Sequence, residues 1–352
     1  MEEKLARKWF IKCIAALIFI LVITALTVFI VDPYFHYHKP LSFLTYRLSE
    51  ERYINDGISR HFDFDALITG TSMAQNFKPS EMDALFGTNS VKETFSGAGY
   101  QELSENLERN LTRNPNLKTV LWVVDYNGFL RDYDWVQYES YPTYLYDDNI
   151  FNDVSYLYNK AILYHGVLTN IRMTLTHTPS TTMDEYSAWE RDCGLDIIMQ
   201  SYDREHVNTN VDTGFGQNEY DAVVKTIDTN IVQLVNRFPD VTFYILYPPY
   251  SICYFDALDI KGTLSRQLQA EQTATELLLE CPNVKLYNFF DQYDIVCDPD
   301  NYCDDGHYNA RVNSLILKWI SEGTGLITKE NYLEKLEAER KFYGNYDYDS
   351  IY

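Results

Sequence analysis

A serine, an aspartate and a histidine occur along the chain in a pattern that suits nucleophilic catalysis. Ser72 ends the stretch Gly70-Thr71-Ser72, directly after a short apolar run, and Asp304 precedes His307 by three residues. A serine hydroxyl is a weak nucleophile at neutral pH unless a base accepts its proton, and imidazole titrates close to that pH. A carboxylate three residues earlier can hold the imidazole in one tautomer. We therefore predict Ser72 as the nucleophile, His307 as the base and Asp304 as the residue that orients the base.

Donors for a developing oxyanion follow two further strand-like runs. The stretch SGAGYQ contains Gly97 and Gly99, and the stretch VVDYNGF contains Asp125 and Asn127. We predict that the backbone N–H groups of Ser72 and Gly99 and the side-chain amide of Asn127 form the oxyanion hole. Gly99 suits this position because a side chain there would crowd the incoming carbonyl group. Gly97 and Asp125 remain open as alternatives.

The rest of the sequence alternates between strand-like and helix-like segments. The predicted strands are residues 65–71, 91–96, 118–126, 241–249 and 284–291, and the main predicted helices are residues 100–115, 218–237, 263–280 and 309–323. Repeated strand–helix units indicate a three-layer α/β/α sandwich with a mostly parallel, five-stranded sheet. The carboxyl ends of parallel strands lie at one edge of such a sheet, so the site residues are expected to meet there.

The N-terminus has the features of a membrane anchor. Four basic residues occur within residues 1–12, and residues 13–31 contain no charge. Nineteen helical residues span about 28 Å, close to the hydrocarbon thickness of a bilayer. No small-residue cleavage site follows, which favours an uncleaved anchor over a signal peptide. Basic residues before the span predict a single-pass protein of the cell membrane, with its N-terminus inside and its catalytic domain extracytoplasmic.

These signals also predict the domain organisation. We expect a cytoplasmic tail at 1–12, a transmembrane anchor at 13–31, a juxtamembrane connector at 32–62, the catalytic domain at 63–325 and a C-terminal helix and tail at 326–352. Residues 128–216 interrupt the strand–helix alternation and are too long for an ordinary loop, so they are predicted to be a partly structured insertion. The insertion contains Tyr141, Tyr144 and Tyr146, which are candidate sugar contacts because tyrosine rings stack on sugars.

Composition narrows the range of partners. The formal charge of −22 argues against nucleic acid and against a general affinity for anionic lipid surfaces. We expect neither a metal nor a cofactor, because His36 and His38 are only two ligands and no CxxC pair occurs.

The cysteines leave their pairing open. Five of the six lie outside the predicted span, at Cys193, Cys253, Cys281, Cys297 and Cys303. Because five is an odd number, at least one thiol is unpaired within the chain. Cys297 and Cys303 flank a short acidic loop, and they either form a disulfide there or remain free thiols.

The ordered motifs resemble those of the SGNH (GDSL-like) hydrolase superfamily over residues 65–320, apart from the insertion. That family has a serine near the start of its domain, a glycine after the second strand, an asparagine after the third strand and a D-x-x-H near its end. In this chain GTS stands where G-D-S is commoner, FSGAGYQ resembles the second block, and DDGHYN matches the last. VVDYNGF lacks the usual G-x-N-D, so either Asn127 or Asp125 fills the third position.

The resemblance implies a function. With its anchor, the layout is similar to SGNH-type proteins that handle acyl groups on bacterial cell-surface polymers, including teichoic-acid D-alanylation and exopolysaccharide O-acetylation proteins. It implies a serine-dependent acyl esterase or O-acyltransferase that acts on an extracytoplasmic glycan or teichoic-acid-like polymer, with a multi-spanning membrane acyltransferase as a possible partner. The alternative is a catalytically inactive SGNH-like module that binds a polymer or docks such an acyltransferase. An α/β-hydrolase fits less well, because that fold places its serine after a middle strand and usually separates its acid from its histidine by a longer loop.

Overall fold

The computed structural model describes residues 2–138, 141–147 and 149–352. The chain divides into two compact units, Met1–Phe62 with Ser140–Thr182 and Asp63–Glu139 with Met183–Tyr352. The first unit therefore combines the N-terminal residues with a segment from the middle of the chain. The second unit contains the sheet and all of the predicted catalytic and oxyanion-hole residues.

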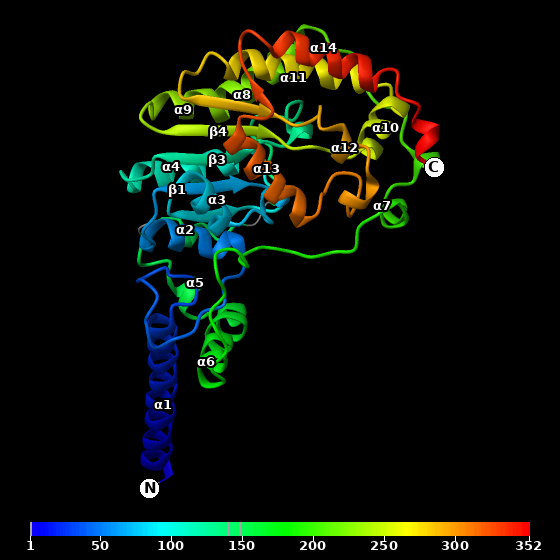
Figure 1. Ribbon diagram of the computed structural model, residues 1–352. Helices are drawn as coiled ribbons and strands as arrows, with labels where there is room; N and C mark the ends of the chain where they lie inside the picture. The colour runs from blue at the N-terminus through cyan, green and yellow to red at the C-terminus, as the bar shows by residue number, and fades with distance from the viewer. Residues whose placement is uncertain (1, 139–140, 148) are drawn as a thin grey trace. The chain divides into compact units, whose positions relative to one another are not determined.

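A six-stranded sheet forms the centre of the second unit (Figure 1). The strands are β1 Ala66–Gly70, β2 Ser90–Thr94, β3 Thr119–Val123, β4 Thr242–Tyr247, β5 Val284–Asn288 and β6 Leu326–Ile327, in the spatial order β2-β1-β3-β4-β5-β6. The first five strands are parallel, and β6 pairs antiparallel with β5. The predicted α/β class with a mostly parallel sheet is confirmed. The prediction of five strands missed β6, because two residues carry too little pattern to indicate a strand.

Helices cover both faces of this sheet. Their bounds are α3 Pro79–Phe86, α4 Tyr100–Arg113, α8 Gln217–Ile227, η6 Asp228–Val232, α9 Gln233–Arg237, α10 Ile252–Ile260, α11 Leu264–Leu278, α13 Ala310–Glu322 and α14 Tyr332–Tyr343. From β1 to β2 the chain moves toward one edge of the sheet, and from β2 through β3 and β4 to β5 it moves toward the other edge. Because each crossover is right-handed, α3 lies on one face of the sheet and α4, α8 and α11 lie on the other. Helix α13 packs against α3, while α11 packs against α8 and α14. The strands β1 and β2 between them are buried along their whole length, as is usual for strands of a parallel sheet.

The first unit is built around the N-terminal helix α1, Glu2–Val31. Among the described residues, this is the one helix long and apolar enough to cross a membrane. It is followed by Asp32, whose buried carboxylate accepts the backbone N–H groups of His36 and His38. The unit also contains α2 Glu51–His61, α5 Val154–Leu157, the π-helix η4 Ile162–Val167 and α6 Leu168–Leu175. The two histidine rings have hydrogen bonds of their own, His36 with Asp153 and His38 with the carbonyl group of Phe29.

One disulfide joins Cys193 to Cys303. Cys297 is a free thiol, so the small loop between Cys297 and Cys303 is not closed by a disulfide. The two bonded residues are 110 positions apart. Spacing along the sequence can suggest disulfides that close short loops. It cannot suggest this pairing, which depends on how the fold brings two distant segments together.

Two buried carboxyl groups link α11 to α14. Glu271 accepts hydrogen bonds from the Tyr126 hydroxyl at 2.9 Å and from Asn288 Nδ2 at 2.7 Å, and Asn288 also donates to Glu339 at 3.0 Å. Burial raises the pKa of Glu271 to about 7. Burial, together with the neighbouring Glu271, raises the pKa of Glu339 well above its usual range. The folded pair therefore retains protons that the unfolded chain has already released.

This pair should make stability depend on pH. Both pKa values are raised on folding. The contribution of this pair to the free energy of unfolding is therefore fully present below the ordinary carboxyl pKa, and it is lost as pH rises through about 7. We expect Glu339→Gln, which keeps the shape but removes one titrating group, to melt at a higher temperature than wild type at about pH 8 and to show a flatter dependence of Tm on pH. Calorimetry over this range tests the expectation. Glu280→Gln at the surface is the control, and equal pH slopes for Glu339→Gln and wild type would contradict the prediction.

Candidate active site

Ser72 lies in a sharp turn immediately after β1. Gly70 has φ of +149°, and a Cβ at this position would lie 2.9 Å from the Cβ atoms of both Ala74 and Val123. Only glycine therefore lets the strand turn at this point without displacing its neighbours. The hydroxyl of Thr71 then accepts the N–H of Met73 at 3.4 Å, which caps the short 3₁₀ helix η1, Ser72–Ala74. Ser72 is thus displayed, partly exposed, at the carboxyl end of β1.

Asp304 and His307 lie in the loop that precedes α13. The Oδ1 atom of Asp304 accepts the backbone N–H of Gly306 at 2.9 Å and that of His307 at 2.6 Å, which folds the loop back on itself. The same carboxylate lies 2.8 Å from His307 Nδ1 through its Oδ2 atom. On the other side of the ring, His307 Nε2 lies 2.7 Å from Ser72 Oγ. Serine, imidazole and carboxylate therefore form one continuous chain of hydrogen bonds, although Ser72 and His307 are 235 positions apart.

Further hydrogen bonds hold the histidine loop against the serine turn and against Ser251, just before α10. The carbonyl oxygen of Met73 accepts the Tyr308 hydroxyl at 3.1 Å and the side-chain amide of Asn313 at 3.2 Å. The Ser251 hydroxyl donates to the carbonyl group of Asp305 at 2.5 Å. Sequence reasoning did not find these three supporting residues. Tyr308 follows His307 directly, but its role depends on a partner more than two hundred residues away.

The charges around His307 stabilise the imidazolium that forms when the ring accepts a proton. Burial alone would lower the pKa of His307, but the hydrogen bond and charge of Asp304, with a smaller contribution from Asp125, raise it above its ordinary value. Burial opposes ionisation of Asp304, yet its contacts with His307 lower the pKa of this carboxyl. Arg191 lies 3.8 Å from the Asp304 carboxylate, and the Trp189 ring meets the His307 ring edge-on at 5.8 Å. The sequence did not predict either of these two neighbours.

The cavity at Ser72 includes one of the two candidate glycines. Its volume is about 350 Å³, and its lining includes Ser72, His307, Gly97 and Asn127, but not Gly99. A Cβ on Gly99 would lie 2.1 Å from the carbonyl oxygen of Trp135. The close approach of Trp135 therefore requires a glycine at position 99, whatever binds in the cavity. Gly97, with φ of +68°, is the glycine that borders the cavity.

Asp125 and Asn127 both border this cavity but differ in their surroundings. Oδ2 of Asp125 accepts the Thr71 hydroxyl at 2.7 Å, while its shielded Oδ1 has no hydrogen-bond partner among the described residues. Burial raises the pKa of Asp125. Asn127 is exposed. An amide always carries donors, whereas a carboxyl group donates only when it is protonated. Asn127 is therefore the better suited of the two side chains to bind an oxyanion.

Replacing Asp125 with asparagine should move the pH dependence of activity. The substitution keeps an oxygen for the Thr71 hydroxyl and removes a negative charge that helps to raise the pKa of His307. His307 must be neutral to accept the serine proton, so activity rises as pH exceeds its pKa. We expect Asp125→Asn to shift this rise in kcat/KM to lower pH. Asp134→Asn, in the exposed part of the following loop, is the control. An unshifted profile for Asp125→Asn would exclude an electrostatic role for this residue.

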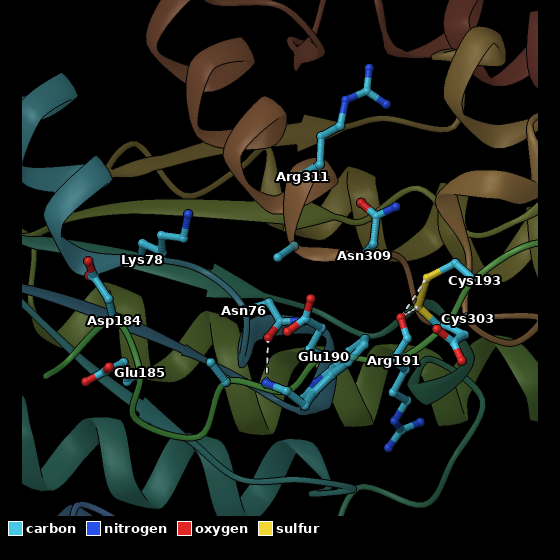
Figure 2. A pocket seen from close by; sticks show the side chains of 14 residues that line it. Asn76, Lys78, Asp184, Glu185, Glu190, Arg191, Cys193, Cys303, Asn309 and Arg311 are labelled. Atoms are coloured by element: carbon cyan, nitrogen blue, oxygen red, sulfur yellow. Dashed lines mark hydrogen bonds between the residues drawn. A yellow bond between two sulfur atoms is a disulfide. The ribbon is translucent and has the colours of Figure 1, made fainter. Parts of the chain in front are cut away.

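A larger groove lies next to the triad (Figure 2). Its volume is about 700 Å³, and its lining includes Trp189 and Arg191, the two neighbours of His307 and Asp304 described above. Figure 2 shows the Cys193–Cys303 disulfide at one end of the groove and Lys78 at the other. Side chains of both charges line it: Lys78, Arg191 and Arg311 are basic, and Asp184, Glu185, Glu190 and Asp192 are acidic. The groove therefore presents both positive and negative groups to whatever enters it.

The comparisons with known proteins give no closer identification. No family model matches the chain, and no curated protein matches it. Among solved structures, a protein from Streptococcus pneumonia that is provisionally named a platelet activating factor is similar with a TM-score of 0.36 and 14% sequence identity, over 77% of this chain and 91% of that chain. A likeness this remote carries no argument about the site, which depends on the geometry described above.

Proposed function

We propose that this chain is a serine-dependent acyl esterase or O-acyltransferase of the SGNH type, acting on an extracytoplasmic glycan or cell-envelope polymer. The hydrogen-bonded chain from Ser72 Oγ through His307 to Asp304 supports this proposal most directly. Each contact is within the distance that proton transfer requires. A polymer-binding module without turnover would not need this arrangement.

The geometry suits acyl transfer in two steps. Ser72 Oγ attacks the acyl carbon while its proton passes to His307 Nε2, and Asp304 stabilises the resulting imidazolium. The oxyanion accepts hydrogen bonds from the Asn127 amide and from backbone N–H groups at the turn. The tetrahedral intermediate then collapses, the leaving alkoxide takes the proton from His307, and the acyl group remains on Ser72. Water or a sugar hydroxyl next gives its proton to His307 and attacks the acyl carbon. The bond to Ser72 Oγ then breaks, and this oxygen takes the proton back from His307, which restores the free enzyme.

The surroundings of the triad support a polymer substrate. The adjoining groove has a volume of about 700 Å³ and carries charges of both signs, which suits a polyhydroxylated chain. The tyrosines proposed as sugar contacts belong instead to the first unit, where the rings of Tyr141 and Tyr146 pack at 4.8 Å. The basic residues at the N-terminal end of α1, before its uncharged span, support an extracytoplasmic location for the site. A membrane acyltransferase that supplies the acyl group remains part of this proposal.

Covalent labelling tests the proposal directly. We expect the purified full-length chain in lipid nanodiscs to react with a fluorophosphonate probe and to hydrolyse p-nitrophenyl acetate. Acetylated glycans, with and without an added sugar acceptor, then distinguish an esterase from a transferase by the ratio of free acetate to transferred acetyl groups. A folded chain that neither reacts with the probe nor turns over any ester would favour the non-catalytic polymer-binding module.

A further inference from the structure

The first unit exposes a second apolar surface in addition to α1. Residues 150–175, which include α5, η4 and α6, will be called the 150–175 segment. Seven of its large apolar side chains are exposed: Ile150, Phe151, Val154, Tyr158, Tyr164, Leu168 and Leu175. Phe151 is 87% exposed and Leu175 is 76% exposed. Outside α1, the described residues include sixteen exposed large apolar side chains, and seven of them lie in this segment. Exposed apolar residues are therefore concentrated here and are not spread evenly over the surface.

This segment packs along the side of α1. The Tyr158 hydroxyl donates to the carbonyl oxygen of Leu21 at 3.2 Å, and both α5 and η4 contact α1 (Figure 1). Gly166 lies so close to the end of the span that a Cβ there would be 2.7 Å from Pro33 Cγ. Leu21 precedes the last residue of α1, Val31, by ten positions, or about 15 Å along the helix. The contact therefore lies at the level of the middle of the apolar span, well below its C-terminal end.

The charge distribution of the segment also differs from that of the chain. Although the formal net charge is −22, Asp153 is the only acidic residue between Asp148 and Asp184. Asp153 is buried and bonded to His36, so it does not charge the exposed face. The segment's Lys160 and Arg172 are basic, and long basic side chains in a membrane extend toward the headgroup region.

We propose that the 150–175 segment is immersed in the lipid bilayer beside the C-terminal half of α1. Its lipid-facing helix, η4 followed by α6, satisfies its backbone groups internally, as the hydrocarbon region requires. The Tyr158 hydroxyl has a hydrogen-bond partner there in the carbonyl oxygen of Leu21, so it is not an unsatisfied polar group in the hydrocarbon region. The first unit is then attached to the membrane by two contacts. This inference rests on α1 crossing the membrane and is independent of the chemistry at Ser72.

Depth-dependent fluorescence quenching tests the inference on the full chain. In a Cys13→Ser background, which removes the exposed native thiol, single variants Phe151→Cys and Leu175→Cys are labelled with an environment-sensitive fluorophore. Leu333→Cys, at an exposed leucine of α14, is the matched control. The proteins are reconstituted in phosphatidylcholine vesicles with or without doxyl groups on the acyl chains. We expect blue-shifted emission at positions 151 and 175, strong quenching by doxyl lipid and little quenching by iodide, and the reverse at position 333.

Two results would overturn the proposal. The first is iodide quenching at positions 151 and 175 equal to that at position 333, which would place the segment in water. The second is exposure to iodide in vesicles of the purified chain together with protection in native membranes, which would indicate that a protein partner covers the surface. Loss of activity in a Ser72 variant would leave the quenching pattern unchanged, so the two proposals fail independently.

Discussion

Replacing Ser72 with alanine is expected to lower kcat by about 10⁴-fold or more, because the variant has no oxygen to form the acyl intermediate. The Ser72 side chain makes its one described hydrogen bond to His307, and the supports of the turn pass through Thr71 and Met73. Folding should therefore be unaffected. Steady-state hydrolysis of p-nitrophenyl acetate measures the loss of turnover, and intact-protein mass spectrometry shows whether an acyl group accumulates on the chain. We expect an acyl adduct in wild type and none in Ser72→Ala.

A second serine in the same cavity provides the control. Ser201 also lines the cavity, but its hydroxyl donates to the carbonyl oxygen of Ile198 at 3.1 Å and has no described contact with His307. Ser201→Ala should therefore retain nearly wild-type turnover and adduct formation. Retained turnover in Ser72→Ala, or an equal loss in Ser201→Ala, would remove Ser72 from the proposed mechanism.

The arrangement of the triad could be anticipated because it depends on local signals and one topological rule. An apolar run that ends in Gly70-Thr71-Ser72 predicts a strand followed by a turn, and Asp304 with His307 at a spacing of three is a local pair. In a parallel sheet the carboxyl ends of the strands lie at one edge. These features were sufficient to expect that Ser72 and His307 would lie near each other, without any knowledge of side-chain packing.

Features that depend on packing between distant segments could not be anticipated. The distance of Gly99 from β2 favoured it over Gly97 as an oxyanion-hole residue. The sequence could not show that Trp135, in another segment, packs directly against Gly99. The pairing of Cys193 with Cys303 likewise depends on the path of the chain. In both cases the decisive neighbour lies far away in sequence, where neither periodicity nor local spacing carries information.

The middle of the chain shows the same limit on a larger scale. Residues 128–216 have weak periodicity and were predicted as one insertion. The structure assigns Ser140–Thr182 to the unit that contains α1, and it assigns the residues from Met183 onward to the unit that contains the sheet. Trp189 and Arg191, close to the triad, come from this later part. A polar, tyrosine-rich sequence does not show where such a division falls, because surface composition is similar in both parts.

Asparagine at position 304 should nearly abolish activity while preserving the loop. Its Oδ1 atom can still accept the backbone N–H groups of Gly306 and His307, so the fold of the loop should survive. The uncharged amide, however, stabilises neither the required imidazole tautomer nor the imidazolium that forms on proton transfer. Substitutions of this kind reduce kcat by about 10⁴-fold. We expect a loss of this size for Asp304→Asn, measured with a chromogenic ester at the pH optimum of the wild type.

The residual activity of Asp304→Asn should also change its pH dependence. The hydrogen bond and charge of Asp304 are what raise the pKa of His307 against the effect of burial. Without them burial prevails, the pKa of His307 falls, and the rise in kcat/KM moves to lower pH because the imidazole is neutral over a wider range. Asp134→Asn, which removes a carboxylate from an exposed loop, is the control. A loss without a shift would mean that Asp304 acts only on the loop, and a shift without a loss would mean that its charge matters but its orientation of the imidazole does not.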